Sequence, residues 1–271
     1  MPAFYENKSS AFFCRDIEGH VLECSMHLHY NLEIAFIYEG KTEVTIDNMP
    51  LQIAEGGDVV VVFPNQVHAF STKVPERHVL LIADPLLFSE FATLFTDHLP
   101  VCNVIRGAAN DSELRSLVQR ISSLFREEDM PRKDIILRGY LLAFIGKLFD
   151  MMNFRRVASG DIQAIGSVMN YCIAHYNENL SLDMLEKKLH ISKYYISHVM
   201  NKKLNMGFND YVNSIRISNA CRMLSGSNLH IREICDAVGF NTVRTFNRAF
   251  VKYMGMSPRE YRNKSICIKE V

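Results

Sequence analysis

Apolar residues in the last third of the chain recur at spacings of three and four, which predicts short amphipathic helices. Between residues 230 and 253 this pattern is interrupted once, at Gly239, because glycine tolerates the left-handed conformation of a tight turn. The stripe before the turn consists of Ile231, Ile234, Cys235 and Val238. The helix after it, from about 241 to 253, has an inner face of Phe246, Ala249, Phe250 and Tyr253.

The opposite face of this last helix is basic and rich in amides. It consists of Val243, Arg244, Asn247, Arg248 and Lys252. Two short helices joined by a glycine turn, with such a face outward, are what insertion into a DNA major groove requires. Pro258 is well placed in the first turn of a final helix.

A second helix-turn-helix pattern lies upstream, at residues 181–203. Ser181 is a predicted N-cap, and Leu182, Leu185 and Leu189 form one stripe. The turn falls at 190–192. The next helix has a buried side of Tyr195 (in part), Ile196, Val199 and Met200, and an exposed side of Lys193, Tyr194, Ser197, His198 and Asn201. A connecting helix over about 208–224, ended by Gly226, would be about 24 Å long, so two reading helices could lie about one DNA turn apart.

Strand signals dominate from about residue 20 to 83. Residues 41–46 alternate between polar and apolar, Asp47-Asn48 indicates a turn, and 59–63 is an apolar run ended by Pro64. Residues 111–153 then return to helical spacing. A helix at 111–128 is amphipathic, and one at 132–153 is apolar over more than half its circumference, which favours burial on two sides. An antiparallel helix-pair dimer interface is our hypothesis, and purely intramolecular packing is the alternative.

Charge separates the two halves of the chain, although Lys+Arg and Asp+Glu are both 30 overall. Residues 1–160 carry 15 basic and 21 acidic side chains, a balance of −6, and residues 161–271 carry 15 and 9, a balance of +6. The basic half contains both helix-turn-helix patterns, as phosphate binding requires.

Seven scattered cysteines without a Cys-x-x-Cys pair favour free thiols in a reducing cytosol, with redox sensing as the alternative. The chain opens with no charged segment followed by an apolar run, and its longest apolar stretches are about five residues, which argues against secretion and membrane spanning. We therefore expect a cytoplasmic protein.

The C-terminal pattern closely resembles the AraC/XylS family of bacterial transcription regulators. The resemblance rests on Val238-Gly239-Phe240, Phe246, Phe250, Gly255, Ser257-Pro258 and Tyr261-Arg262. Upstream, the matching positions are Phe208, Tyr211, Arg216, Ala220 and Leu224. The departures are Val251 for a common lysine, Asn205 for glycine, Met200 for phenylalanine, and Leu185-Glu186 where an alanine is usual. The first helix-turn-helix is therefore less typical than the second.

The resemblance implies which side chains contact DNA. The base-contacting residues would be Tyr194, Ser197, His198, Val243, Arg244, Asn247 and Arg248. Arginine can fork onto guanine, asparagine can pair with adenine, and valine can pack on a thymine methyl. The phosphate contacts would be Lys193, Lys202, Lys203, Lys252 and Arg259.

The strand-rich segment contains His27-x-His29-x3-Glu33-x6-Gly40, and then Gly57-Asp58 and His68. This resembles the first cupin motif at full spacing and the second only loosely, which implies a double-stranded β-barrel. Three readings of His27, His29, Glu33 and His68 stay open: polar lining of a small-molecule pocket, a metal site of three nitrogens and a carboxylate, or hydrogen-bonded structural groups. We expect the pocket, no resident cofactor or metal, and no enzyme activity. A cupin-type metal enzyme with a DNA-binding module is the remote alternative.

These inferences define a two-domain α+β chain. The expected divisions are a cupin-like sensor barrel at 1–110, dimerisation helices at 111–153, a linker at 154–160, and an all-α double helix-turn-helix domain at 161–271. The expected function is sequence-specific transcription regulation at the bacterial nucleoid, controlled by a small-molecule effector. The expected partners are a double-stranded DNA operator, a second copy of the chain, and, as a candidate, RNA polymerase. A regulator whose barrel is only a dimerisation scaffold is the alternative.

Overall fold

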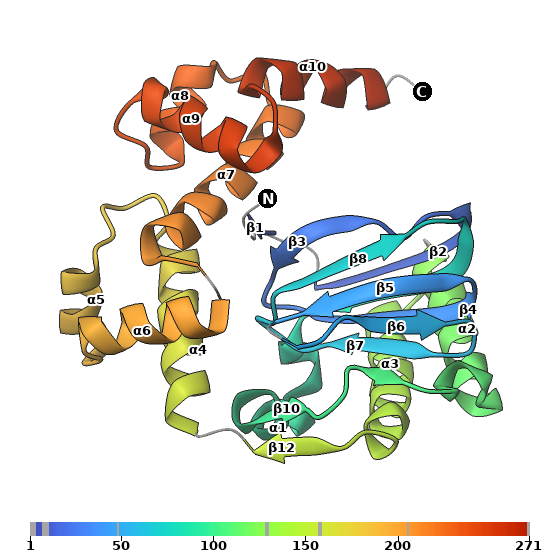
Figure 1. Ribbon diagram of the computed structural model, residues 1–271. Coiled ribbons are helices and arrows are strands. Elements are labelled where there is room, and N and C mark those ends of the chain that lie inside the picture. Colours follow the sequence, from blue (N-terminus) through green and yellow to red (C-terminus); the bar gives the residue numbers. More distant parts are fainter. Residues whose placement is uncertain are drawn as a thin grey trace. The chain divides into compact units, whose positions relative to one another are not determined.

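In the computed structural model the chain divides into two units with separate cores (Figure 1). The residues that the structure describes are 4–6, 11–47, 49–127, 130–156, 159–204 and 206–269. One unit takes the chain from Gln163 onward together with residues 4–6 and Met26–Leu28, and the other takes the described parts of Lys8–Ser25 and His29–Ile162. The predicted fold class is confirmed, because the N-terminal unit is built on β-sheets with a packed helix pair and the C-terminal unit is mainly helical.

One sheet of the N-terminal unit is antiparallel, in the order β11-β7-β4-β9-β2. Its strands are β2 (Phe12–His20), β4 (Leu32–Glu39), β7 (Val59–Val62), β9 (Glu76–Ala83) and β11 (Val104–Ile105). The central strand β4 is buried on both faces, which suits its apolar sequence. Ile34 and Phe36 pack toward the covering helices, whereas Ala35 and Ile37 face the second sheet. Glu33 is the charged exception in this buried run.

The second sheet has its strands in the order β3-β8-β5-β6. They are β3 (Cys24–Leu28), β8 (His68–Thr72), β5 (Lys41–Ile46) and β6 (Gln52–Glu55). The alternation predicted at 41–46 is confirmed, since Thr42, Val44 and Ile46 are buried. Asp47 follows with a positive φ of 49°, as the predicted turn requires, while Asn48 lies outside the described residues. The inner faces of the two sheets share an apolar core.

Two long helices cover the other face of the first sheet, α2 (Ser112–Arg126) and α3 (Lys133–Asp150). Asp111 caps α2 by accepting hydrogen bonds from the backbone N–H groups of Glu113 and Leu114. Most of the wide apolar face of α3 is buried in this unit's own core, although Ile135 is 71% exposed. The shorter elements are η1 (Pro85–Phe91), α1 (Ala92–Asp97), β10 (His98–Pro100), η2 (Ala108–Asn110) and β12 (Phe154–Arg156).

The C-terminal unit is formed by seven described helices. They are α4 (Ser159–Ala174), α5 (Leu182–Leu189), α6 (Lys193–Leu204), α7 (Phe208–Gly226), α8 (Ile231–Ala237), α9 (Val243–Met254) and α10 (Pro258–Lys269). The helices predicted from the apolar spacing are therefore present, and Gly226 is the last residue of α7. Asn205, which stands where the family usually has glycine, lies outside the described residues.

A short strand from the start of the chain, β1 (Phe4–Tyr5), belongs to this helical unit and pairs in parallel with His27 and Leu28. The Phe4 ring lies 5.8 Å from the ring of Tyr253, and the Tyr5 ring meets that of Tyr211 edge-on at 5.8 Å. Tyr5 and Tyr211 are both buried. Phe4 and Tyr5 thus complete the core against which α7 and α9 pack.

Candidate nucleic-acid interface and sensor site

The tight turn between α8 and α9 depends on Gly239, which has a φ of +86°. A side chain here would place its Cβ 2.6 Å from the carbonyl oxygen of Asn177 and 2.8 Å from that residue's Cα. Glycine is therefore required both by the left-handed backbone and by the close approach of another chain segment. Thr242 caps the following helix by accepting a hydrogen bond from the N–H of Thr245.

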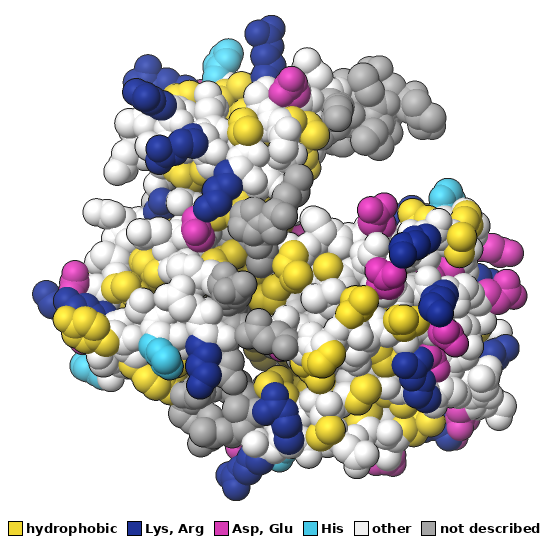
Figure 2. Space-filling view, viewed as in Figure 1, with side chains coloured by type: hydrophobic (Ala, Val, Ile, Leu, Met, Phe, Trp, Pro, Cys, Tyr) yellow, Lys and Arg dark blue, Asp and Glu magenta, His cyan; other side chains and the backbone are white. Residues whose placement is uncertain are grey.

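The two faces of α9 separate as predicted from the sequence. Its buried side chains are Phe246, Ala249, Phe250 and Tyr253. The predicted outward residues Arg244, Asn247, Arg248 and Lys252 are exposed, and Val243 is partly buried. Figure 2 shows Lys and Arg side chains distributed over the surface of the α8–α9 region. A rigid helix therefore presents guanidinium and amide groups outward, the groups that read base edges in a major groove.

The first helix-turn-helix, α5 and α6, has the same plan. Ser181 caps α5 by accepting from the N–H of Met184, and His190 ends it in a left-handed conformation with φ of 55°. On α6, Ile196, Val199 and Met200 are buried, whereas Tyr194 is 78% exposed and His198 is exposed. Ser197 is partly buried. The three proposed base-contacting side chains thus lie on the side away from the buried face.

The predicted phosphate contacts have different surroundings. Nζ of Lys193 forms an ion pair with Asp183 at 2.6 Å, and Nζ of Lys252 forms one with Asp210 at 2.5 Å. Both lysines are therefore partly neutralised within the chain. Lys202 and Arg259 are exposed, and the side chain of Lys203 lies outside those that the structure describes.

A groove of about 730 Å³ runs between the N-terminal half of α7 and α9. Arg248 and Lys252 line it, and so do residues that the sequence did not single out as DNA contacts: Asn209, Asn213, Thr242 and Thr245. The signal that could have found them is their position near the N-terminal ends of two predicted helices, which commonly bind anionic groups. Arg216 also lines the groove, but its guanidinium donates to the carbonyl oxygens of Tyr176 and Glu178, which assigns it a packing role.

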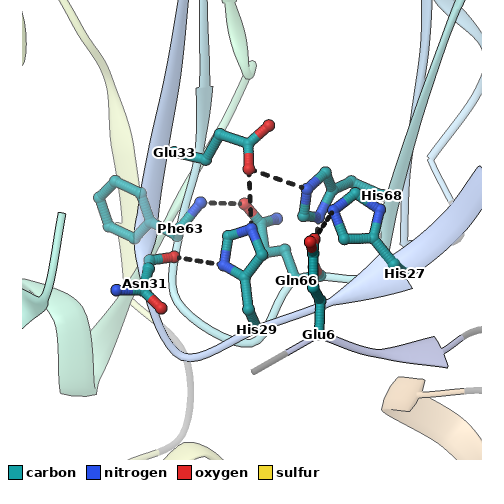
Figure 3. A network of polar contacts seen from close by, with 8 residues as sticks. All are labelled: Glu6, His27, His29, Asn31, Glu33, Phe63, Gln66 and His68. Carbon is teal, nitrogen blue, oxygen red and sulfur yellow. Dashed lines mark hydrogen bonds and ion pairs between the residues drawn. The ribbon is translucent and has the colours of Figure 1, made fainter. Parts of the chain in front are cut away.

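In the N-terminal unit, three of the four sequence-predicted residues come together: His29, Glu33 and His68 (Figure 3). One ligand atom from each of these three residues lies within 4.8 Å of the others, and all three are buried. His27 is also buried, but it belongs to the part of β3 that groups with the helical unit. His29 directly follows β3, Glu33 is on β4, and His68 begins β8. Oε2 of Glu33 is 2.7 Å from Nε2 of His29 and 3.6 Å from Nε2 of His68. The spacing of the motif therefore identified a real cluster.

Glu33 is ionised in this cluster. Burial alone would raise the pKa of its carboxyl, but hydrogen bonds from His29 and His68, together with their charges, outweigh burial and hold the pKa well below its usual value. A buried carboxylate surrounded by imidazoles is suited to bind a cation or a polar group of a ligand.

A second buried polar cluster, which the sequence did not predict, lies between the two sheets. Nδ1 of His78 lies 3.1 Å from Oε1 of Glu76, and the hydroxyl of Thr42 donates to Oε2 of Glu76 at 2.6 Å. His78 and Glu76 are both buried. Their i, i+2 spacing on a strand could have indicated a shared face, but the contact with Thr42 spans 34 residues.

The pKa values of the cysteine thiols test whether the cysteines could act as redox sensors. Burial raises the pKa of Cys14 to about 11 and that of Cys172 and Cys221 to about 12. These thiols stay protonated and weakly reactive at neutral pH. None of the cysteines whose side chains the structure describes forms a disulfide. None of the helices in the described part of the chain combines the length and apolarity that a membrane crossing needs.

One family match lies within the helical unit, and similar full-length proteins match most of the chain. Residues 185–264 match the helix-turn-helix domain family. The chain is 22% identical to the Msm operon regulatory protein of Streptococcus mutans over 86% of this chain and 84% of that protein. It is 25% identical to the HTH-type transcriptional regulator YdiP of Escherichia coli over 89% of this chain and 82% of that protein. The similarity thus includes the sheet-rich unit.

Among solved structures, ToxT from Vibrio cholerae has a similar fold. It superposes with a TM-score of 0.65 at 15% identity, covering 93% of this chain and 98% of that chain. A ToxT structure with a bound unsaturated fatty acid superposes with a TM-score of 0.61 at 17% identity, covering 95% of this chain and 96% of that chain. The two-unit fold is therefore shared with a protein whose structure holds a small molecule.

Proposed function

We propose that this chain, which carries an AraC-type helix-turn-helix domain, is a DNA-binding transcription regulator that reads its operator through α6 and α9 and is controlled by a small molecule bound between the N-terminal sheets. The observation that carries the DNA-reading part is the division of α9 into a buried aromatic face and an exposed face of Arg244, Asn247 and Arg248. A solvent-facing helix needs no such set, whereas major-groove recognition does.

We expect α6 and α9 to contribute differently to DNA recognition. Arg244, Asn247 and Arg248 on α9 contact base edges together with Val243, and α6 contributes Tyr194, Ser197 and His198. The lysines at 193, 202, 203 and 252 and Arg259 contact phosphates, and they position the protein without reading sequence. The less basic base-reading set of α6 leads us to expect that α9 contributes more of the specificity.

The proposed effector site lies between the two sheets, beside the Glu33 cluster. The side chains there form a packed apolar core that includes Ala35, Ile37, Val44 and Phe70, with polar clusters at Glu33 and at Glu76, so an effector would have to displace part of this core. The structure of ToxT with a fatty acid supports the idea that a fold of this kind takes a small molecule. An effector would act by binding DNA-competent and DNA-incompetent forms with different affinity.

We further propose that two copies associate through α2 and α3, and that the dimer acts at the bacterial nucleoid, where RNA polymerase is a candidate partner. Support comes from the apolar side chains that α3 leaves at its surface, with Ile135 exposed and Ile136 and Leu142 partly buried. A dimer would double the number of DNA segments read by α6 and α9.

Selection of bound duplexes from a random pool at about 150 mM salt tests the function directly. We expect two short conserved blocks about ten base pairs apart, one for each reading helix. Arg248→Ala should lower affinity for the selected site by about 5- to 150-fold, which corresponds to about 1–3 kcal/mol, and relax the preference at one base pair. The matched control is Arg222→Ala, which removes an exposed arginine from α7 instead of α9.

An equal loss of operator affinity in Arg248→Ala and Arg222→Ala would mean that Arg248 contributes only its charge. Recovery of no motif with or without candidate effectors would contradict the function itself. A motif that is recovered equally well from a variant with a bulkier side chain between the sheets would support the scaffold alternative.

A further inference from the structure

The groove between α7 and α9 adjoins the face of α9 that is proposed to read bases. Arg248 belongs to both surfaces, since it is exposed on α9 and also lines the groove. From Arg248 the groove continues to the N-terminal half of α7, the helix that joins the two helix-turn-helix motifs (Figure 1). A molecule bound on the reading face of α9 would therefore also meet this groove.

Two asparagines on α7 offer their amides to the groove. Asn209 and Asn213 are four residues apart, so their side chains share one face of the helix and lie about 6 Å apart along its axis. Within the described part of the chain, neither amide forms a hydrogen bond. By contrast, the amide of Asn219 on the same helix donates to the carbonyl oxygen of Ile215 at 3.0 Å. Two amide donors are thus available to a bound molecule.

The charged side chains of the groove favour an anionic occupant. Arg216, Arg248 and Lys252 line it, and Asp210 is the one carboxylate among its described lining residues. Nζ of Lys252 lies 2.5 Å from Oδ1 of Asp210, and the hydroxyl of Tyr253 donates to the same oxygen at 3.4 Å. The carboxylate is therefore neutralised within the protein, and the two arginines leave the groove with a positive balance.

The shape of the site selects one part of a nucleic acid. A groove of about 730 Å³ with polar side chains on both walls takes a narrow ridge, and the ridges of a duplex are its sugar–phosphate strands. When α6 and α9 lie in successive major grooves on one face of DNA, the strands between those two segments pass the helix that connects them. α7 has 19 residues and is about 28 Å long, so it spans most of the roughly 34 Å of one duplex turn.

We propose that this groove seats a sugar–phosphate strand of the operator between the segments read by α6 and α9, with Asn209 and Asn213 donating to its phosphate oxygens. Amides that bind phosphate fix the position of a protein along the duplex without reading bases. They would thereby set the spacing between the two conserved blocks of the operator. The inference rests on the proposed function and deepens it, because it adds contacts from the connecting helix to those of the two reading helices.

The first test replaces phosphates of the operator one at a time by uncharged methylphosphonate linkages, at each position between the two blocks. The protein is the full-length chain, and affinity is measured on the operator obtained by selection. At least one of these neutral linkages should weaken wild-type binding by about tenfold, because it removes the charge to which the amides donate.

The second test removes both amides. Asn209→Ala combined with Asn213→Ala should lower affinity for the unmodified operator by about 10- to 100-fold. Base preference and the salt slope should stay unchanged, because neutral amides release no counterions. The neutral linkage that weakens wild type should cost this double variant little further affinity. The control is Asn228→Ala, which removes an exposed asparagine that does not line the groove and should bind like wild type.

Wild-type binding that no neutral linkage between the blocks weakens would overturn the proposal, whether or not the variants fold. A double variant that binds as tightly as Asn228→Ala would also overturn it, as would one that loses as much affinity as wild type on every neutral linkage. These outcomes refute only the groove if wild type binds its selected operator. Failure of wild type to select any operator, with or without candidate effectors, would instead refute the proposed function.

Discussion

Replacement of Gly239 by alanine should disrupt the turn that positions α9. A non-glycine residue in the left-handed region costs about 1–2 kcal/mol. The new Cβ would also lie 2.6 Å from the Asn177 carbonyl oxygen, and since its neighbours are backbone atoms the segment itself must move. Forced shifts of this kind cost about 1–3 kcal/mol, so we expect a total destabilisation of about 2–5 kcal/mol.

Hydrogen exchange of the full-length chain measures this loss of stability in the helices on either side of the turn. Amides in α8 and α9 should lose protection by roughly 30-fold to several thousand-fold, because each 1.4 kcal/mol is about a factor of ten. The control is Gly226→Ala in the same unit, where an added Cβ meets nothing within 4 Å. That variant should be unchanged or stabilised by about 0.5–1 kcal/mol. Unchanged protection in Gly239→Ala, or an equal loss in both variants, would refute the argument that this turn requires glycine.

Three further predictions concern charge and assembly. The pKa of Glu33 is depressed in the folded state, so its stabilising contribution is present above the unfolded pKa of about 4.3 and is lost as the pH falls through the folded pKa. Wild type should therefore lose stability below about pH 4 more steeply than Glu33→Gln, as measured by denaturant titrations at stepped pH. Lys252→Ala should reduce the slope of log affinity for DNA against log salt concentration by about 1. Asp210→Asn should tighten DNA binding, because it releases Lys252 from its ion pair to contact phosphate. Both are measured by fluorescence anisotropy across a salt series, and an Asp210→Asn variant that binds DNA no better than wild type would contradict this role of Lys252. Ile135→Glu should shift the sedimentation mass toward the 31.1 kDa of a single chain, and a mass that is the same for wild type and variant would argue against the α2–α3 interface.

Helical periodicity predicted the C-terminal unit closely, because one local rule decides which side of a short helix is buried. Phe246, Phe250 and Tyr253 are buried where the spacing placed them, and Ser181 forms the expected cap. The Glu33 cluster could also be predicted, since its motif has a characteristic spacing. What such patterns miss is pairing between distant segments. Nothing local indicates that Thr42 would donate to Glu76, or that Lys193 and Lys252 would meet Asp183 and Asp210.

The assignment of β1 to the helical unit was beyond sequence reasoning for the same reason. A strand of two residues, Phe4 and Tyr5, has no periodicity of its own, and its aromatic partners lie more than 200 residues further along the chain. Only tertiary packing determines where such a segment belongs.

The aromatic contacts of β1 have a practical consequence for work on the DNA-binding part alone. A fragment that starts at Gln163 contains every helix from α5 onward, but it lacks the rings that cover Tyr211 and Tyr253. The side chain of Tyr211 is fully buried in the intact chain, and burial raises the pKa of its phenol well above the usual value. The excised fragment would expose this apolar surface to water and should be less stable and more prone to self-association than the same helices in the intact protein.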